Sequence, residues 1–396
     1  MLSNKGDAAQ DDLAPSTSSH ESTSRAVSKV KLEKSVVICA DILQTDDTER
    51  HPDLWFSDGS VVLLAQKILF RVHMSILSRH SIFFRDMFSL PQPSTTPPSY
   101  PTTFPTCRGD FDGCPLVHLH DTAEDLASLL NALYDGPKFG NNDREDFRVV
   151  SGILRLATKY LIDSLRNRAL EHLSIAWPST LKAWDAREEV AGEYYVDSDE
   201  QRFHPSPVHV INLAREVNVP SLLPSAFYDL SRYSFNALLD ANNAATAALD
   251  VSALSLADTQ KLALGKEFAQ LAVPSLIRSM ATETQPYLAH MQSYPLPAQP
   301  RHPQGRGQVR GSCTSAAACR RDVSELVDLA TQHYLFDHER GACDPLYVAE
   351  ELGLLKSAEM EGADCKACGR ALEVWAARER ERLWRAIPGW FRLETP

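Results

Sequence analysis

The chain has 396 residues, of which 43% are hydrophobic and 23% are charged, and its formal net charge is −12. That composition is ordinary for a globular protein with a buried hydrophobic core, and the length has room for about two or three domains. The net negative charge disfavours nucleic acid or an anionic membrane as the partner of the whole molecule, because phosphate contacts need clustered cations.

Neither a targeting segment nor a membrane span is expected. Residues 1 to 25 are polar and contain no apolar core of the kind that a signal peptide carries. No stretch of the sequence approaches the ~20 uninterrupted apolar residues that a membrane helix needs. We therefore expect an intracellular protein, in the cytoplasm or the nucleus, whose eight cysteines are reduced and available to bind metal or to lie buried.

The first part of the chain predicts a disordered segment and then a β-hairpin and a helix. Residues 1 to 50 are rich in Ser, Thr, Asp and Lys, which is typical of disorder. Aliphatic residues from 60 to 72, with a break at Gln66-Lys67, predict two paired strands. In FRVHMSILSRHSIFFRDMF, residues 70 to 88, apolar residues recur at spacings of three, four and seven, which predicts a helix with a wide apolar face.

A proline-rich insertion separates this helix from the rest of the predicted domain. Residues 91 to 115 hold too many prolines for a helix or a central strand. A short strand is predicted at 116 to 119, and Asp121 then caps a leucine-rich helix that Gly136 ends. A helix pair follows over 147 to 173, so the predicted fold class is α+β.

The order of these elements resembles the BTB/POZ family, and the domain that it implies spans residues 51 to 176. In that family an Asp opens the first paired strand, and a Phe-x-x-His leads into a helix with the pattern Leu-x-x-x-Ser-x-x-Phe-x-x-Met-Phe. Leu133-Tyr-Asp-Gly136 is similar to the Tyr-Thr-Gly that ends the next helix of the family. The matching motif positions in this chain are Asp58, Phe70, His73, Leu77, Ser81, Phe84, Met87 and Phe88.

The resemblance implies a homodimer. In BTB domains the corresponding helix packs on its own sheet and on the twin helix of a second subunit, and such a two-fold contact is self-complementary. An apolar patch above ~400 Å² is expected to be covered or functional. The alternative is a helix that is wholly buried within the monomer. The residues expected at the dimer interface are Ile76, Leu77, Phe83, Phe84, Met87 and Phe88.

One position departs from the family pattern. Many transcription-type BTB domains carry a basic residue directly after the motif histidine, where it faces the family's aspartate across a charged pocket. Here Met74 follows His73, so Asp58 lacks that partner and corepressor binding is not carried over. We expect His73 to be half-buried and to donate a hydrogen bond to a nearby carbonyl, rather than to act as a catalytic base.

Two linkers divide the remainder of the chain. Residues 186 to 207 hold six acidic residues between Glu188 and Glu200 and are predicted to be an acidic linker, and 295 to 312 are predicted to be a Pro/Gly/Arg linker. Residues 208 to 292 are predicted to be all-helical with breaks at prolines, including Pro274. This segment resembles the helical extension of many BTB proteins from mushroom-forming (basidiomycete) fungi. Residues 313 to 396 are predicted to form a small helical tail that contains cysteines.

The tail holds a pattern that suits a metal ion. Cys365-Lys-Ala-Cys368 has the two-residue gap that lets both thiolates reach one tetrahedral zinc. Cys313 and Cys319 could complete an all-cysteine site, and Cys343 could replace either of them. The alternative is that these residues are reduced thiols on a helical tail. A second possible set is a mixed set that combines two cysteines and two histidines, namely Cys313, Cys319, His333 and His338. The gap between its two cysteines is too wide for a zinc finger.

These observations predict a protein-interaction scaffold and not an enzyme. No Ser or Cys with a base and an orienting acid can be assembled from sequence order, so no catalytic residue is assigned, and the only cofactor considered is a structural zinc. The expected partners are a second copy of the chain and other proteins. The scaffold would be an adaptor that presents targets to a cullin-type ubiquitin ligase, or a transcription-associated protein with a zinc-stabilised tail. The alternative of a different class is a metal- or thiol-dependent enzyme in the tail.

Overall fold

The structure is a computed structural model that describes residues 48–90, 110–197, 204–235, 238, 251–283, 316–336, 341–354 and 365–393. The predicted disordered segment up to residue 47, residues 91–109 of the insertion and the predicted linker at 295–312 lie outside these residues. The described chain is mostly helical with one small sheet, which confirms the predicted α+β class. No helix among the described residues is long and apolar enough to cross a membrane.

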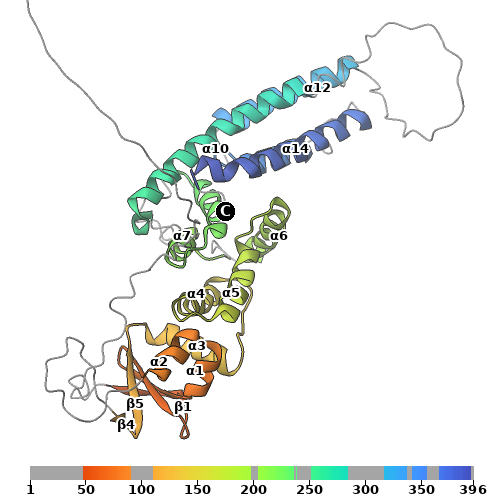
Figure 1. The fold of residues 1–396 in the computed structure, drawn as a ribbon. Coiled ribbons are helices and arrows are strands. Elements are labelled where there is room, and N and C mark those ends of the chain that lie inside the picture. Colours follow the sequence, from red (N-terminus) through yellow and green to blue (C-terminus); the bar gives the residue numbers. More distant parts are fainter. Residues whose placement is uncertain are drawn as a thin grey trace, which may run out of the picture.

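A small sheet lies at one end of the molecule, with strand order β1-β3-β2-β5-β4 (Figure 1). Its strands are β1 (Glu49–Trp55), β2 (Val61–Ala65), β3 (Ile68–Val72), β4 (Asp110–Phe111) and β5 (Cys114–Leu119). β2 and β3 form the predicted antiparallel hairpin, with Val61 opposite Val72 and a positive φ of 52° at Gln66 in the turn. The end of the predicted insertion is a second hairpin, because β4 pairs with β5 and β5 begins at Cys114.

Five helices complete what we call the sheet domain, residues 49 to 176. They are α1 (Met74–His80), α2 (Ile82–Ser89), α3 (Ala123–Tyr134), α4 (Arg144–Lys159) and α5 (Asp163–Ala176). The prediction of one continuous helix through the apolar residues from 76 to 88 is therefore wrong. The backbone of Ser81 is extended, with φ −119° and ψ 120°, and its hydroxyl caps α2 by accepting from the Phe84 amide at 3.0 Å.

The cap of α3 also differs from the prediction. The N-cap is Thr122, whose hydroxyl accepts from the Asp125 amide at 3.1 Å, and not Asp121. The carboxylate of Asp121 instead receives Lys159 Nζ at 2.6 Å and the hydroxyl of Tyr160. A buried carboxylate with two donors thus ties the start of α3 to the end of α4.

The rest of the described chain forms an all-helical unit, residues 181 to 393, which we call the helical body. Its elements are α6 (Leu181–Asp197), α7 (Pro207–Glu216), η2 (Pro220–Leu222), α8 (Leu223–Ser231), η4 (Val251–Ala253), α10 (Leu256–Glu283), α12 (Ala316–Thr331), η6 (Gln332–Phe336), α13 (Pro345–Leu354) and α14 (Lys366–Trp390). The acidic linker predicted at 186–207 is wrong over 186–197, which belong to α6. The predicted break at Pro274 is also wrong, because α10 continues through it.

The tail predicted at 313–396 is part of this body and not a small separate unit. α14 lies beside α10, and the two helices form a long arm with α12 at its far end (Figure 1). The chain then returns toward the middle of the molecule, where Phe391 is fully buried and stacks on Phe227 at a ring distance of 5.3 Å. Side chains from α8, α10, α13 and α14 share one hydrophobic core.

Helix α4 joins the two units because two adjacent sides of it enter two different cores. Phe147, Val150 and Leu154 belong to the core of the helical body. Ile153, Leu156 and Ala157 belong to the core of the sheet domain. One amphipathic segment therefore fixes the sheet domain against the body, and surfaces made by α4 and the body together are rigid.

Candidate functional site

The histidine of the sequence motif lies in a small polar cluster at the start of α1. His73 Nε2 is 3.3 Å from Asp58 Oδ2, and His73 Nδ1 is 2.8 Å from the hydroxyl of Tyr134. The hydrogen bond with His73 holds the pKa of Asp58 below its usual value. The predicted carbonyl partner is therefore wrong, although His73 is half-buried as expected. The cluster ties the start of α1 to the loop before β2 and to the end of α3.

Two further motif residues, Phe70 and Ser81, have structural roles. Phe70 is fully buried in the core of the sheet domain. Ser81 is 1% exposed, and its hydroxyl donates to the Tyr160 carbonyl at 2.6 Å while capping α2. The Ser81 hydroxyl thus caps α2 and bonds the junction between α1 and α2 to the end of α4. These two hydrogen bonds explain why a serine stands between two apolar segments.

Two of the six predicted interface residues are buried within one chain. Leu77 and Phe84 have no exposed surface, so a second copy cannot cover them, and the prediction is wrong for these two. Phe84 packs against Tyr160 at a ring distance of 4.8 Å. The remaining four, Ile76, Phe83, Met87 and Phe88, are partly exposed.

Apolar surface remains on α2 after this packing. Ile82 is 47% exposed and Leu90, at the end of the helix, is 64% exposed, and neither was among the predicted interface residues. We use the term α2 face for Ile82, Phe83, Met87, Phe88 and Leu90.

Three of the four predicted zinc ligands lie together. The sulfur atoms of Cys319, Cys365 and Cys368 are all within 4.8 Å of one another. Cys319 comes from α12, whereas Cys365 is the N-cap of α14 and Cys368 lies in its first turn. Cys319 is 3% exposed and Cys365 is 1% exposed. The fourth predicted ligand, Cys313, and His338 of the mixed set lie outside the described residues, and His333 and Cys343 are not part of the cluster.

The spacing of these sulfurs is close to that of a zinc–thiolate site. Four sulfurs at about 2.3 Å from a tetrahedral zinc are about 3.8 Å apart, so closing the cluster needs shifts of roughly 1 Å. The described cysteines form no disulfide. The amino end of α14 also favours negative charge at Cys365 and Cys368, because the helix dipole is positive there. The donor set therefore fits a thiophilic ion.

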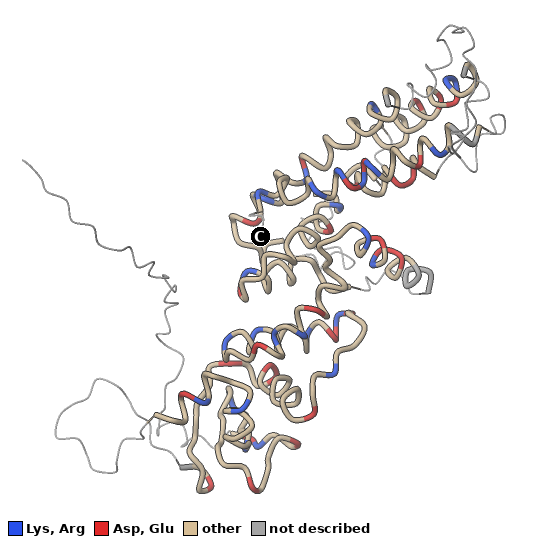
Figure 2. Tube along the Cα trace, turned by 45° about the vertical axis from the view of Figure 1, so that its right-hand side comes forward, with Lys and Arg blue, Asp and Glu red and all other residues tan. Residues whose placement is uncertain are grey.

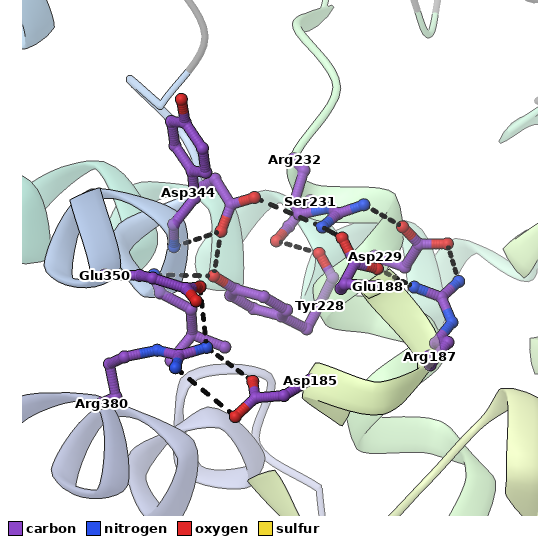
Figure 3. Close-up of polar contacts among 12 residues, drawn as sticks. Asp185, Arg187, Glu188, Tyr228, Asp229, Ser231, Arg232, Asp344, Glu350 and Arg380 are labelled. Carbon is purple, nitrogen blue, oxygen red and sulfur yellow. Dashed lines mark hydrogen bonds and ion pairs between the residues drawn. The ribbon is translucent and has the colours of Figure 1, made fainter. Parts of the chain in front are cut away.

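A buried network of ion pairs connects α6 to α8 (Figure 3). Arg187, whose side chain is 3% exposed, donates to Asp229 at 2.9 Å and pairs with Glu188. Arg232 donates to Asp229 at 3.0 Å and to Glu188 at 2.6 Å. The guanidinium of Arg187 also lies 4.6 Å from the ring of Trp184. Two arginines thus neutralise two acids inside the body. In the sequence, the acidic run that begins at Glu188 gives no sign of this pairing.

A second set of ion pairs beside this network joins α6 to α13 and α14 (Figure 3). Arg380 of α14 donates to Asp185 of α6 at 2.5 Å and pairs with Glu350 of α13 at 3.1 Å. Burial raises the pKa of both carboxyl groups, and Arg380 opposes that shift. A cavity of about 540 Å³ beside the network is lined by cations and anions together. We infer that these ion pairs hold α6 against the rest of the helical body.

Comparison with known proteins adds no relative. No protein-family model matches the chain, and a search of curated proteins finds no match. Figure 2 shows acidic and basic residues interspersed over both the sheet domain and the helical body. Two of the predicted sites therefore have a geometry that suits their predicted role. They are the α2 face, as an interface, and the three-cysteine cluster, as a metal site.

Proposed function

We propose that the protein is a protein-interaction scaffold that forms a homodimer through the α2 face. The observation that supports this most is the 47% exposure of Ile82 beside partly exposed Phe83 and Met87. A two-fold contact can cover such a surface because the same patch serves both subunits. The BTB/POZ resemblance of residues 51 to 176 supports the same contact, since that family dimerises through the corresponding helix.

A charge placed on the α2 face tests the dimer. The wild-type chain should have the mass of a dimer by light scattering at micromolar concentration. Ile82→Asp should give a folded monomer, because a carboxylate in an apolar contact loses its hydration without gaining a partner. Ile175→Asp is the matched control, since Ile175 of α5 is 64% exposed and lies outside the α2 face. A monomeric wild type would contradict the proposal.

Within this class we propose an adaptor that presents targets to a cullin-type ubiquitin ligase. The resemblance of the sheet domain and the helical body that follows it support this role, because an adaptor needs one unit for the ligase and another for the target. Affinity capture of the chain followed by mass spectrometry tests it. Recovery of a cullin favours the adaptor, and recovery of chromatin proteins without a cullin favours the transcription-associated scaffold.

We also propose that Cys319, Cys365 and Cys368 bind a structural zinc ion. The observation that supports this is the approach of their three sulfurs to within 4.8 Å. Thiolate ligands suit zinc, and a structural site has four ligands. Cys313, six positions before Cys319, stays the predicted fourth ligand. The ion would hold the amino end of α14 against α12.

Metal analysis of the purified full chain tests the zinc proposal. We expect one zinc per chain, and cobalt substitution should give the absorption of a tetrahedral thiolate site. Cys365→Ser and Cys319→Ser should abolish both signals, whereas Cys343→Ser should leave them unchanged, because Cys343 lies outside the cluster. Folded chain that contains no metal after purification in the presence of zinc would contradict the proposal. Loss of metal in Cys313→Ser would identify the fourth ligand.

A further inference from the structure

A groove of about 490 Å³ lies where the sheet domain meets the helical body. One wall is α4 and the other is α7, along its whole length, with the two residues before it. The floor is apolar, since Phe147 of α4 is 9% exposed and Leu213 of α7 is 2% exposed. Because α4 packs into the cores of both units, the groove has fixed walls. Its volume is in the range of ligand pockets.

The rim of this groove is basic. Three arginines and one histidine line it, against one glutamate, Glu216. Arg155 is already bound, because it donates to Glu216 at 2.9 Å and to Asp125 at 2.7 Å. Arg148 pairs with Glu124. The side chains of Arg144 and His209, in contrast, make no hydrogen bond or ion pair with the part of the chain that the structure describes.

A buried hydroxyl in the groove also lacks a partner. Ser206 is 5% exposed and lines the groove, and its Oγ atom has no hydrogen-bond partner among the described residues. It is the N-cap of the ten-residue helix α7, yet its side chain makes no capping hydrogen bond. A buried hydroxyl without a partner is costly, so a ligand atom that accepts its hydrogen bond would be favoured there. The positive end of the α7 dipole favours an acceptor that carries negative charge.

We propose that this groove binds an acidic segment of a partner protein in which carboxylate residues alternate with apolar ones. A carboxylate would accept from the Ser206 hydroxyl at the amino end of α7 and would pair with Arg144 and His209. A neighbouring apolar side chain would pack on Phe147 and Leu213. The basic rim and the unsatisfied hydroxyl account for the acid, and the apolar floor accounts for a peptide in place of a small anion. This inference rests on the proposed scaffold function and names its partner class.

Fluorescence anisotropy with a labelled Glu-Glu-Leu-Asp-Phe-Glu-Glu peptide tests the groove. The full-length wild type should bind it, and the amide counterpart with Gln and Asn should bind at least roughly tenfold more weakly, because charge-assisted hydrogen bonds are lost. Arg144→Glu should weaken binding roughly ten- to hundredfold without unfolding the chain, since Arg144 is exposed and an acid suits the first turn of α4. Arg168→Glu, at an exposed position of α5, is the matched control for the change of charge.

Ser206→Ala separates a binding role from a structural one. Its hydroxyl has no partner to lose, so the melting temperature should stay the same or rise, while peptide affinity falls about two- to tenfold. Equal binding of the acidic and amide peptides, or of wild type and Arg144→Glu, would overturn the proposal. Displacement of the peptide by inorganic phosphate, beyond that by chloride at equal ionic strength, would assign the groove to a small anion instead. A chain that dimerises but does not bind the peptide would refute the groove alone and leave the scaffold standing.

Discussion

His204 is a buried histidine that stays neutral where an ordinary histidine becomes charged. Its Nδ1 atom is 3.3 Å from the carbonyl of Asn142. Burial, with the nearby charge of Arg187, lowers the pKa of His204 from 6.5 to about 4. Between these values the unfolded chain binds a proton that the folded chain does not bind. We therefore expect unfolding to become easier by up to roughly 3 kcal/mol as the pH falls from about 6.5 to 4.

Urea unfolding of wild type and His204→Gln across this pH range checks the prediction. The difference in unfolding free energy between the two proteins should shrink as the pH falls, because only the wild type carries the titrating ring. Asp185 and Glu350 have raised pKa values and act in the opposite direction, but they are present in both proteins and cancel in the difference. Parallel pH profiles would show that His204 does not contribute.

Gly265 is a second residue whose role depends on distant packing. A Cβ atom there would lie 1.9 Å from the ring of Phe391, so Gly265→Ala should destabilise the body by about 1–3 kcal/mol. Gly192→Ala in α6 is the control, because nothing lies within 4 Å of its Cβ position, and it should stabilise by up to about 1 kcal/mol. Thermal unfolding of both variants measures the effect, and equal shifts would contradict this explanation.

The role of a residue could be predicted from the sequence where its neighbours in the chain determine it. It could not be predicted where the determining partner lies far along the chain. Gly136 ends α3 with a φ of 83°, as its position after the leucine-rich segment indicated. Nothing near Gly265 indicates that Phe391 comes to rest on it. The role of Ser81 was likewise hidden, because its second partner, the Tyr160 carbonyl, lies far along the chain.

At the scale of elements, α6 shows why a charged segment is easily mistaken for a linker. Six acids within a short stretch are typical of a solvated spacer. In the structure, Glu188 is held by Arg187 and Arg232, and Trp184 is 2% exposed. Arg232 lies more than forty residues from Glu188 in the chain. The helix is stable because of partners that no local pattern reveals.

Removing one partner from the buried network should be far more costly than removing an exposed pair. Arg187→Ala removes one of the two arginines that pair with Asp229, which is 1% exposed, and we expect a loss of about 3–5 kcal/mol. Lys138→Ala breaks an exposed pair with Asp135 and should cost about 0–1 kcal/mol. Urea unfolding at neutral pH measures both. Similar small costs would show that water reaches the network.

At the scale of the molecule, the sequence predicted the α+β class, the hairpin of β2 and β3, strand β5 and the helices that follow it, but not β1, β4 or the division between α1 and α2. It failed at the boundary between the body and the tail. The linker predicted at 295–312 suggested a separate tail, yet α14 shares its core with α8 and α10. Cys365 and Cys368 could be predicted as ligands because their two-residue gap is a local pattern, whereas the groove joins α4 to α7 and has no such pattern.

Because α4 belongs to both cores, the two units should unfold together. Leu154 is fully buried in the core of the body, so Leu154→Ala should cost about 2–5 kcal/mol. Circular dichroism and tryptophan fluorescence should still report one transition at a lower midpoint. Two separate transitions in wild type would show that α4 does not couple the units.

The position of Phe391 has a consequence for how the chain is made. The sheet domain contains everything needed for its core by residue 176 and can form while translation continues. The helical body cannot close until the ribosome has added Phe391, because that ring fills the space over Gly265 and stacks on Phe227. Until then the surface of α8 and α10 that Phe391 covers stays open, so we expect the body to complete its core only at the end of synthesis.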